Sequence, residues 1–149
     1  TVLASMAATR DYEVVAGYLE EFSPTAAQLD WLKMRQEQKA DWAYEELKAF
    51  LEHSWANRVD PVVVPGSIYG AIGLCQFMPT NVLKLGVDGD RDGKIDLFDP
   101  ADAIHSTANY LKNAGWRKGL NHKGQIRVIM RYNHDINYAG TVLAIAKRI

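Results

Sequence analysis

Residues 88–102 hold six aspartates, and this acidic stretch constrains the fold more than any other feature of the chain. The stretch also contains one arginine and one lysine, so its net charge is −4, whereas the formal net charge of the whole chain is −1. Like charges gathered this closely repel one another, and they cost stability unless a cation neutralises them. We therefore expect a loop that collects negative charge within an otherwise mildly basic chain.

The first nine residues of this stretch follow the pattern D-x-D-x-D-G-x-I-x, which is typical of calcium-binding loops. In such a loop the alternate aspartates converge, the glycine permits a sharp turn, and the isoleucine anchors the loop to the core. Oxygen atoms are the ligands that Ca²⁺ prefers. The predicted ligands are Asp88, Asp90, Asp92, the backbone carbonyl of Lys94, and Asp96 either directly or through a water molecule.

Two aspartates compete to close this loop. Asp99 stands at the twelfth position, but Asp99-Pro100 is also a typical N-cap followed by a first helical proline. Asp102 lies one turn into that helix and can point back to the ion. We expect Asp102 to close a lengthened loop while Asp99 mainly caps the helix. The alternative is a solvated acidic turn without a metal. A second loop of this kind is absent from the sequence, which favours a structural ion over a calcium sensor.

The composition is that of an ordinary globular domain. The chain has 149 residues, of which 48% are hydrophobic and 23% charged. We expect one domain over residues 1–149, with the calcium loop at 88–102. Cys75 is the only cysteine, which excludes an internal disulfide and argues against a cysteine-based zinc site. The near-neutral charge argues against nucleic-acid binding, and the sequence has no transmembrane segment. The lack of an initiator methionine leads us to expect an excised or processed piece.

The hydrophobic periodicity predicts a mainly α-helical fold. Apolar side chains recur at helical spacing, with prolines and glycines at the expected ends. We expect at most a short pair of strands, inside the acidic loop. The segment from Pro61 to Gly66 reads as an extended connector. The predicted helices are residues 11–22, a long helix opened by Ser23-Pro24 and ending near Asn57, and helices over 79–86, 99–115, 125–131 and 137–149.

A glycine-rich turn over residues 67–79 is the second unusual stretch. Small residues at positions 70, 71 and 73 allow a close backbone approach, and Gln76 places an amide among apolar neighbours. No lysine followed by serine or threonine completes a phosphate-binding loop. From composition alone, the turn is best interpreted as a tight helix–helix crossing with Gln76 as a satisfied core group.

Four motifs in this order resemble the lytic murein transglycosylase B type, a lysozyme-like family. The resemblance is dense from Asp60 to Trp116 and looser at both ends. It implies a lysozyme-like fold and an enzyme of the bacterial cell envelope or periplasm, in which a lipid can anchor the full-length protein. The motifs are Gly66-Ser-Ile-Tyr-Gly-Ala-Ile-Gly-Leu-Cys-Gln-Phe-Met-Pro79, the acidic loop with Asp99-Pro-Ala-Asp-Ala-Ile104, Ala108-Asn-Tyr-Leu-Lys-Asn-Ala-Gly-Trp116, and Tyr132-Asn-His134 with Tyr138 and Val142.

The resemblance implies cleavage of the β-1,4 bond between N-acetylmuramic acid and N-acetylglucosamine in peptidoglycan, with a 1,6-anhydro product. One buried glutamate would act first as acid and then as base. By resemblance, the residues that contact the sugars are Ser67, Gln76, Tyr132, Asn133 and Tyr138. Without the resemblance, the preferred interpretations are a capping role for the serine and core packing for both tyrosines.

The position of the catalytic glutamate departs from the family pattern. The segment from Thr1 to Ala7 resembles a family helix that lies just downstream of that glutamate, so the acid is expected before Thr1. Glu52 is a weaker candidate, because it precedes Ser67 by fifteen residues rather than about nine. Glu13, Glu20 and Glu21 rank lower still. The alternative function is a non-catalytic, calcium-stabilised peptidoglycan-binding domain that lacks the general acid. In either case we expect a monomer.

Overall fold

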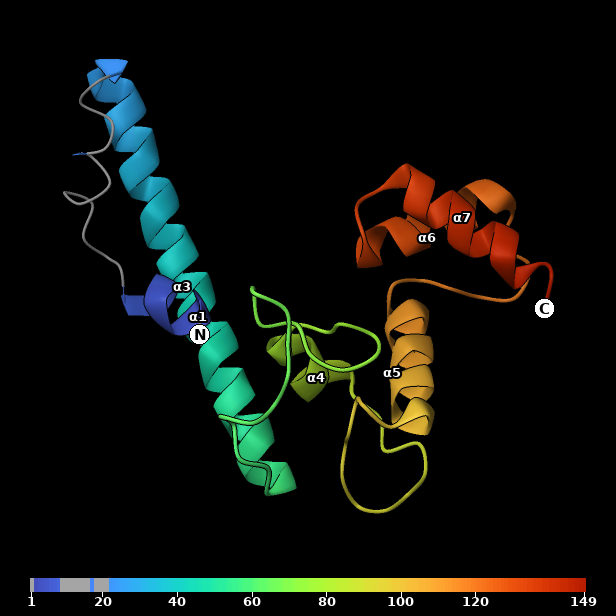
Figure 1. Cartoon of the computed structure of the whole chain (residues 1–149). Coiled ribbons are helices and arrows are strands. Elements are labelled where there is room, and N and C mark those ends of the chain that lie inside the picture. Colours follow the sequence, from blue (N-terminus) through green and yellow to red (C-terminus); the bar gives the residue numbers. More distant parts are fainter. Residues whose placement is uncertain (1, 9–16, 18–21) are drawn as a thin grey trace. The chain divides into compact units, whose positions relative to one another are not determined.

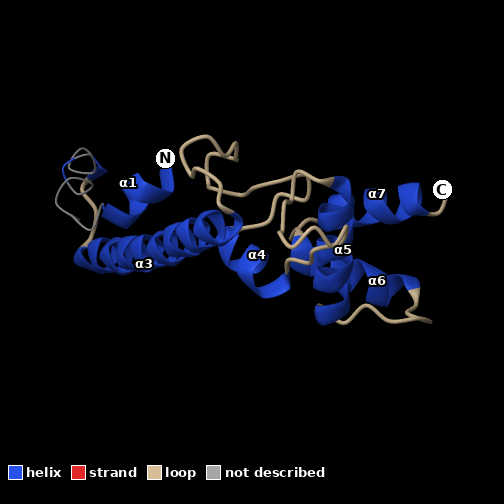
Figure 2. Cartoon of the chain, turned by 90° about the horizontal axis from the view of Figure 1, so that it is seen from below, coloured by secondary structure: helices blue, strands red, loops and turns tan. Residues whose placement is uncertain are grey.

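The computed structural model describes residues 2–8, 17 and 22–149 (Figure 1). The helix predicted over residues 11–22 therefore lies almost wholly outside the described residues, as do Glu13, Glu20 and Glu21. Helices and loops account for the described chain apart from isolated bridges (Figure 2), and the mainly α prediction is confirmed. The helices are α1 (Val2–Ala8), α3 (Ala26–Asn57), α4 (Pro79–Leu85), α5 (Pro100–Asn113), α6 (His122–Tyr132) and α7 (Ile136–Ala146). None of these helices is long and apolar enough to cross a membrane.

The chain divides into two compact units, Thr1–Lys84 and Leu85–Ile149. The first unit carries α1, α3 and α4, and the second carries α5, α6 and α7. The expectation of one domain over residues 1–149 stays a prediction.

Helix α3 begins two residues later than Ser23-Pro24 predicts, because a different residue provides the cap. Thr25 is the N-cap, and its hydroxyl accepts a hydrogen bond from the Gln28 backbone N–H at 3.3 Å. The Gln28 side chain in turn accepts one from the Thr25 backbone N–H at 2.8 Å. This reciprocal capping box satisfies two backbone donors at once. The predicted end near Asn57 is confirmed, and Arg58 closes the helix in the left-handed conformation with φ of 57°.

In the first unit, α1 packs against α3. The buried apolar residues of α3 are alanines at positions 40, 43 and 49, and such small side chains allow a close approach. Leu3 of α1 is 4% exposed. A β-carbon added at Gly70 would overlap Leu3 Cδ1, so the glycine-rich turn also lies directly against α1.

In the second unit, a small apolar core joins the last three helices. Asp99 and Pro100 open α5 as predicted. Helix α6 begins three residues earlier than predicted because Asn121 caps it, and α7 ends at Ala146 rather than at the chain end. The core contains Ile129, Ala139 and Leu143, with Leu111, Trp116, Ile126, Met130 and Val142 packed against them.

The contact between Gly70 and α1 can be separated from backbone strain with two glycine variants. Gly70 and Gly119 have nearly equal φ, 86° and 84°, but a β-carbon at Gly119 would meet nothing within 4 Å. Both Gly70→Ala and Gly119→Ala should incur the left-handed penalty of about 1–2 kcal/mol. Only Gly70→Ala should incur a further cost of about 1–3 kcal/mol from overpacking against Leu3. Urea unfolding measures both, and equal losses would contradict the close packing of the turn on α1.

Candidate functional site

The glycine-rich segment is a loop of paired backbone groups and not the helix–helix crossing that composition favours. Two isolated antiparallel bridges join Gly66 to Ile72 and Ile72 to Phe77. The Ser67 backbone N–H donates to the Ala71 carbonyl at 2.8 Å, and the Ala71 N–H donates back to the Ser67 hydroxyl at 3.0 Å. Ile72 and Phe77 exchange two backbone hydrogen bonds. The small β element therefore lies here and not in the acidic loop. Ser67 also fixes the shape of its own turn.

Gln76 is exposed, so it is not the satisfied core group that its apolar neighbours suggested. Its backbone is left-handed, with φ of 51°, and its N–H donates to the Gly73 carbonyl. The side-chain Nε2 also donates to Gly73 O at 2.9 Å, which holds the amide over the turn. A residue other than glycine rarely adopts this conformation, because the β-carbon crowds the backbone. Among the described residues, Ser23, Arg58 and Arg91 share this conformation, and Gln76 is the predicted sugar contact that adopts it.

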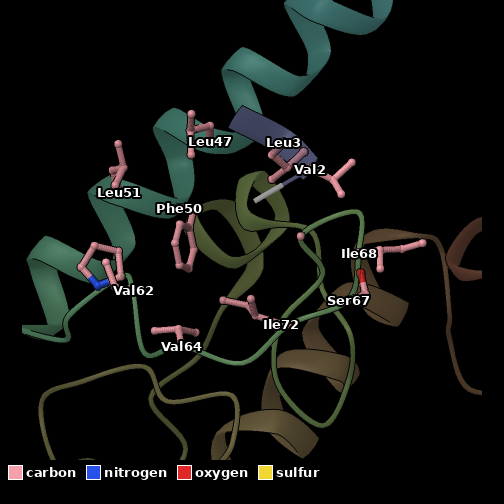
Figure 3. Close-up of a pocket in the computed structure, with 13 residues that line it drawn as sticks. Val2, Leu3, Leu47, Phe50, Leu51, Val62, Val64, Ser67, Ile68 and Ile72 are labelled. Carbon is pink, nitrogen blue, oxygen red and sulfur yellow. The ribbon is translucent and has the colours of Figure 1, made fainter. Parts of the chain in front are cut away.

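An apolar cavity of about 600 Å³ lies between this loop, α1 and α3 (Figure 3). Ser67 and Ile68 line it from the loop, while Leu47, Phe50 and Leu51 line it from α3. The other lining residues are Val2, Leu3, Pro61, Val62, Val64, Gly66, Gly70 and Ile72. Ser67 is the polar side chain in this lining, so one face of the loop combines a hydroxyl with an apolar surface.

Glu52 does not have the surroundings of a general acid. It is exposed on α3 and borders a shallow hollow of about 180 Å³ that also contains Lys48 and Lys84. A catalytic acid is usually kept protonated by burial in apolar surroundings. An exposed glutamate beside lysines has no such surroundings.

Glu46 is a buried glutamate that sequence analysis did not identify. Its side chain is 4% exposed. Oε2 accepts a hydrogen bond from the Thr80 backbone N–H at 2.9 Å, and Oε1 accepts one from the Thr80 hydroxyl at 2.8 Å. Both oxygens are thus engaged by one residue, so this carboxyl group links α3 to α4. The sequence signal that could have identified Glu46 is its helical spacing from Ala43 and Ala49, which lie on the buried face of α3.

In the second unit, the acidic loop folds through hydrogen bonds from its own backbone. Asp88 accepts three of them, from the N–H groups of Arg91, Asp92 and Gly93, at 2.6, 3.2 and 2.9 Å. The Asp90 side chain accepts from Asp92 N–H at 3.0 Å. The Asp92 and Asp96 side chains each accept from the backbone two residues further on, at 2.8 and 2.9 Å. These short-range bonds turn the aspartate side chains back over the loop.

Asp102 closes the loop from the next helix. It is 1% exposed, and its two oxygens accept from the N–H groups of Gly89 and Asp96, both at 2.7 Å. Asp99 caps α5 by accepting from the Ala101 and Asp102 N–H groups. A β-carbon at Gly89 would lie 2.6 Å from the Ala101 carbonyl oxygen, so only glycine lets the loop approach α5 this closely.

Three carboxylates of this loop form a group that can hold a cation. Oxygens of Asp88, Asp90 and Asp102 all lie within 4.8 Å of one another. Ca²⁺–oxygen distances are about 2.3–2.6 Å, so ligands on opposite sides of one ion are about 5 Å apart. The group therefore fits Ca²⁺ in both spacing and ligand chemistry. Among the described residues it does not include Asp92, Asp96 or Asp99, and the Lys94 carbonyl remains a predicted ligand.

The charges within this group act on Asp90. The hydrogen bond from the Asp92 backbone lowers the pKa of Asp90, but other effects outweigh it. Desolvation, the charges of Asp92 and Asp102, and a side-chain hydrogen bond with Asp88 leave that pKa above its ordinary value. Such a shift is expected where carboxylates share a site without a neutralising ion.

The remaining three predicted sugar contacts lie around the end of α6 in the second unit. Tyr132 is half-buried, and its ring meets Tyr110 edge to face, with centroids 5.2 Å apart. Asn133 is exposed at the C-cap of α6. Tyr138 is 38% exposed in the first turn of α7. These three residues therefore lie in the second unit, whereas Ser67 and Gln76 lie on one loop of the first unit.

The chain belongs to the family of the transglycosylase SLT domain, whose family model matches residues 2–127. Over 81 residues it is 44% identical to the membrane-bound lytic murein transglycosylase B of Escherichia coli (strain K12), a match that covers 54% of this chain and 22% of that protein.

The solved structures similar to this chain include two lytic transglycosylases. The soluble lytic transglycosylase SltB1 from Pseudomonas aeruginosa is 28% identical with a TM-score of 0.68, over 74% of this chain and 57% of that chain. The Escherichia coli lytic transglycosylase Slt35 in complex with calcium is 42% identical with a TM-score of 0.55, over 57% of this chain and 27% of that chain. The chain thus spans less than two thirds of the length of these relatives.

The strained backbone of Gln76 leads to a stability prediction. Gln76→Ala keeps the left-handed strain and loses the side-chain hydrogen bond to Gly73, whereas Gln76→Gly loses the same side-chain bond but relieves the strain. Gln76→Gly should therefore be more stable than Gln76→Ala by about 1 kcal/mol. The measurement is the free energy of unfolding in urea. An alanine variant as stable as the glycine variant would contradict the strain at this position.

Proposed function

We propose that this chain is part of a lytic transglycosylase that acts on the glycan strands of peptidoglycan. The bond cleaved is the β-1,4 bond between N-acetylmuramic acid and N-acetylglucosamine, and the product carries a 1,6-anhydro ring. The observation that carries this proposal is the family match across residues 2–127, together with relatives that are lytic transglycosylases.

Within this proposal, five side chains of the chain bind the sugars. Ser67 and Gln76 supply a hydroxyl and an amide on one exposed loop, which suits the N-acetyl and carboxyl groups of the sugars. Asn133 contributes a second amide, and Tyr132 and Tyr138 contribute aromatic surface. The conformational strain at Gln76 supports its role as a ligand contact.

The reaction needs one carboxyl group that acts first as a general acid and then as a general base. A glutamic acid protonates the leaving glycosidic oxygen, and the sugar N-acetyl oxygen stabilises the positive charge that develops at the anomeric carbon. The glutamate then takes the proton from the C6 hydroxyl as that oxygen attacks and closes the anhydro ring. We propose that this acid precedes Thr1. The exposure of Glu52 and the double contact of Glu46 with Thr80 support this position.

The acidic loop is proposed to bind one structural Ca²⁺. Asp88, Asp90 and Asp102 would hold it, with Asp92, Asp96 and the Lys94 carbonyl as further ligands. The ion would supply the positive charge that the loop lacks, and it would take no part in bond cleavage. The spacing of the three carboxylate oxygens and the calcium complex of the related Slt35 support this proposal.

A second function is a peptidoglycan-binding domain that lacks the general acid. The exposure of Glu52 and the double contact of Glu46 with Thr80 support this function for residues 1–149 alone. We further propose a bacterial cell-envelope or periplasmic location, a lipid anchor in the full-length protein, and a monomeric state. The membrane-bound relative in Escherichia coli supports the location.

The two proposed functions predict different products when purified peptidoglycan sacculi are incubated with the protein. Residues 1–149 should bind sacculi in a pull-down but release no anhydromuropeptides detectable by mass spectrometry. A version extended upstream to include the proposed glutamate should release them. Release by residues 1–149 that Glu52→Gln abolishes would instead identify Glu52 as the acid.

The calcium proposal is tested by two isosteric substitutions in the same helix turn. Asp102→Asn removes a charge from the three-carboxylate group and should weaken Ca²⁺ binding by about tenfold or more, measured by calorimetry. Asp99→Asn keeps a good capping residue and should change the affinity by about threefold or less. Chelation should lower the melting temperature of the wild type, because the carboxylates then repel one another. Equal affinities of the two variants would contradict the role of Asp102.

A further inference from the structure

Glu46 is a buried carboxylate that neither the acidic loop nor the proposed sugar contacts use. It lies in the middle of α3, with buried Ala43 and Ala49 one turn away on either side. An ionised carboxylate in such surroundings costs free energy unless its oxygens accept hydrogen bonds. Glu46 therefore needs a partner with hydrogen-bond donors for its oxygens.

Thr80 is that partner, and it uses both of its donors. The backbone N–H and the hydroxyl of Thr80 reach separate oxygens of Glu46, at 2.9 and 2.8 Å. Thr80 is the second residue of α4, and an N–H in the first turn has no acceptor within its own helix. The link spans 34 residues of sequence, and it gives each oxygen of the buried carboxyl group a hydrogen-bond partner.

From α4 the link continues into the loop that carries Ser67 and Gln76. Phe77 stands three residues before Thr80, is 2% exposed, and exchanges two backbone hydrogen bonds with Ile72. Ile72 is in turn bridged to Gly66, which is next to Ser67. Gln76 directly precedes Phe77. A displacement of α4 relative to α3 is therefore passed on to both candidate sugar contacts.

We infer that Glu46 is a positioning residue, which acts through Thr80 to hold the loop of Ser67 and Gln76 in the arrangement that binds an N-acetylated amino sugar. The identity of the ligand rests on the proposed function, whereas the mechanical link rests on the contacts described above. Glu46 itself touches no sugar. Its role is to set where α4 begins and thereby where the loop lies on α3.

Substitutions on both sides of the link test this inference in the full chain. Thr80→Val removes the hydroxyl donor, and Thr80→Ser retains both donors. Glu46→Gln turns an acceptor into an amide, and Glu45→Gln is the matched control because Glu45 is exposed on the preceding position of α3. The probe is the disaccharide N-acetylglucosaminyl-1,6-anhydro-N-acetylmuramic acid. Its affinity is measured by calorimetry, and the backbone amides of the chain are monitored by NMR.

The affinity of Thr80→Val and Glu46→Gln for the disaccharide should fall by about tenfold, and Thr80→Ser and Glu45→Gln should stay within about twofold of the wild type. The amide signals of Ser67 and Gln76 should shift in the two weakened variants. Ca²⁺ affinity should not change, since the acidic loop lies in the other unit.

The outcome separates the inference from the proposed function. Wild-type affinity in Thr80→Val with unshifted Ser67 and Gln76 signals would overturn the positioning role. If the wild type binds no disaccharide, the sugar assignment fails, and the amide shifts alone decide the link: shifts that reach Ser67 and Gln76 support it, and shifts confined to the neighbours of Thr80 overturn it. If Glu46→Gln does not fold, the comparison of Thr80→Val with Thr80→Ser gives the same answer.

Discussion

The second unit depends on one buried carboxylate, that of Asp102. Its two oxygens accept hydrogen bonds from Gly89, near the start of the acidic loop, and from Asp96, near its end. Because Asp102 belongs to the first turn of α5, the loop can close only where that helix begins, and Asp99 fixes the beginning by capping it. The loop, the cap and the helix are therefore one structure, and a cation that enters it meets carboxylates that the backbone has already oriented.

The first unit also contains a buried carboxyl group that accepts two hydrogen bonds, but this group joins two helices instead of lying at a candidate ion site. Glu46, like Asp102, is a buried acid on a helix whose two oxygens both accept hydrogen bonds from a segment distant in sequence. The difference lies in the neighbours. Asp102 shares its surroundings with Asp88 and Asp90, so the charge is concentrated where an ion can bind. Glu46 meets both donors of the single residue Thr80, and the contact joins two helices.

Sequence patterns predicted the features that are decided locally. The mainly α-helical fold, the end of the long helix near Asn57, and the Asp99-Pro100 helix start all follow from residues a few positions apart. The predicted start of α3 was wrong because Ser23-Pro24 and Thr25 are both favourable helix N-termini. Only the reciprocal hydrogen bonds between Thr25 and Gln28 decide between them. The loop around Gln76 was misread because a residue other than glycine adopts the left-handed conformation there, beside Gly70 and Gly73. Glu46 was missed because its partner is 34 residues away.

The close approach at Gly89 limits how the acidic loop can vary. Any side chain there would press on the main chain of α5, which cannot give way without losing the helix turn that carries Asp102. Positions 91 and 94, in contrast, are exposed and can change without touching α5. In this chain, the glycine directly after the first aspartate is therefore what allows the acidic loop to lie against α5.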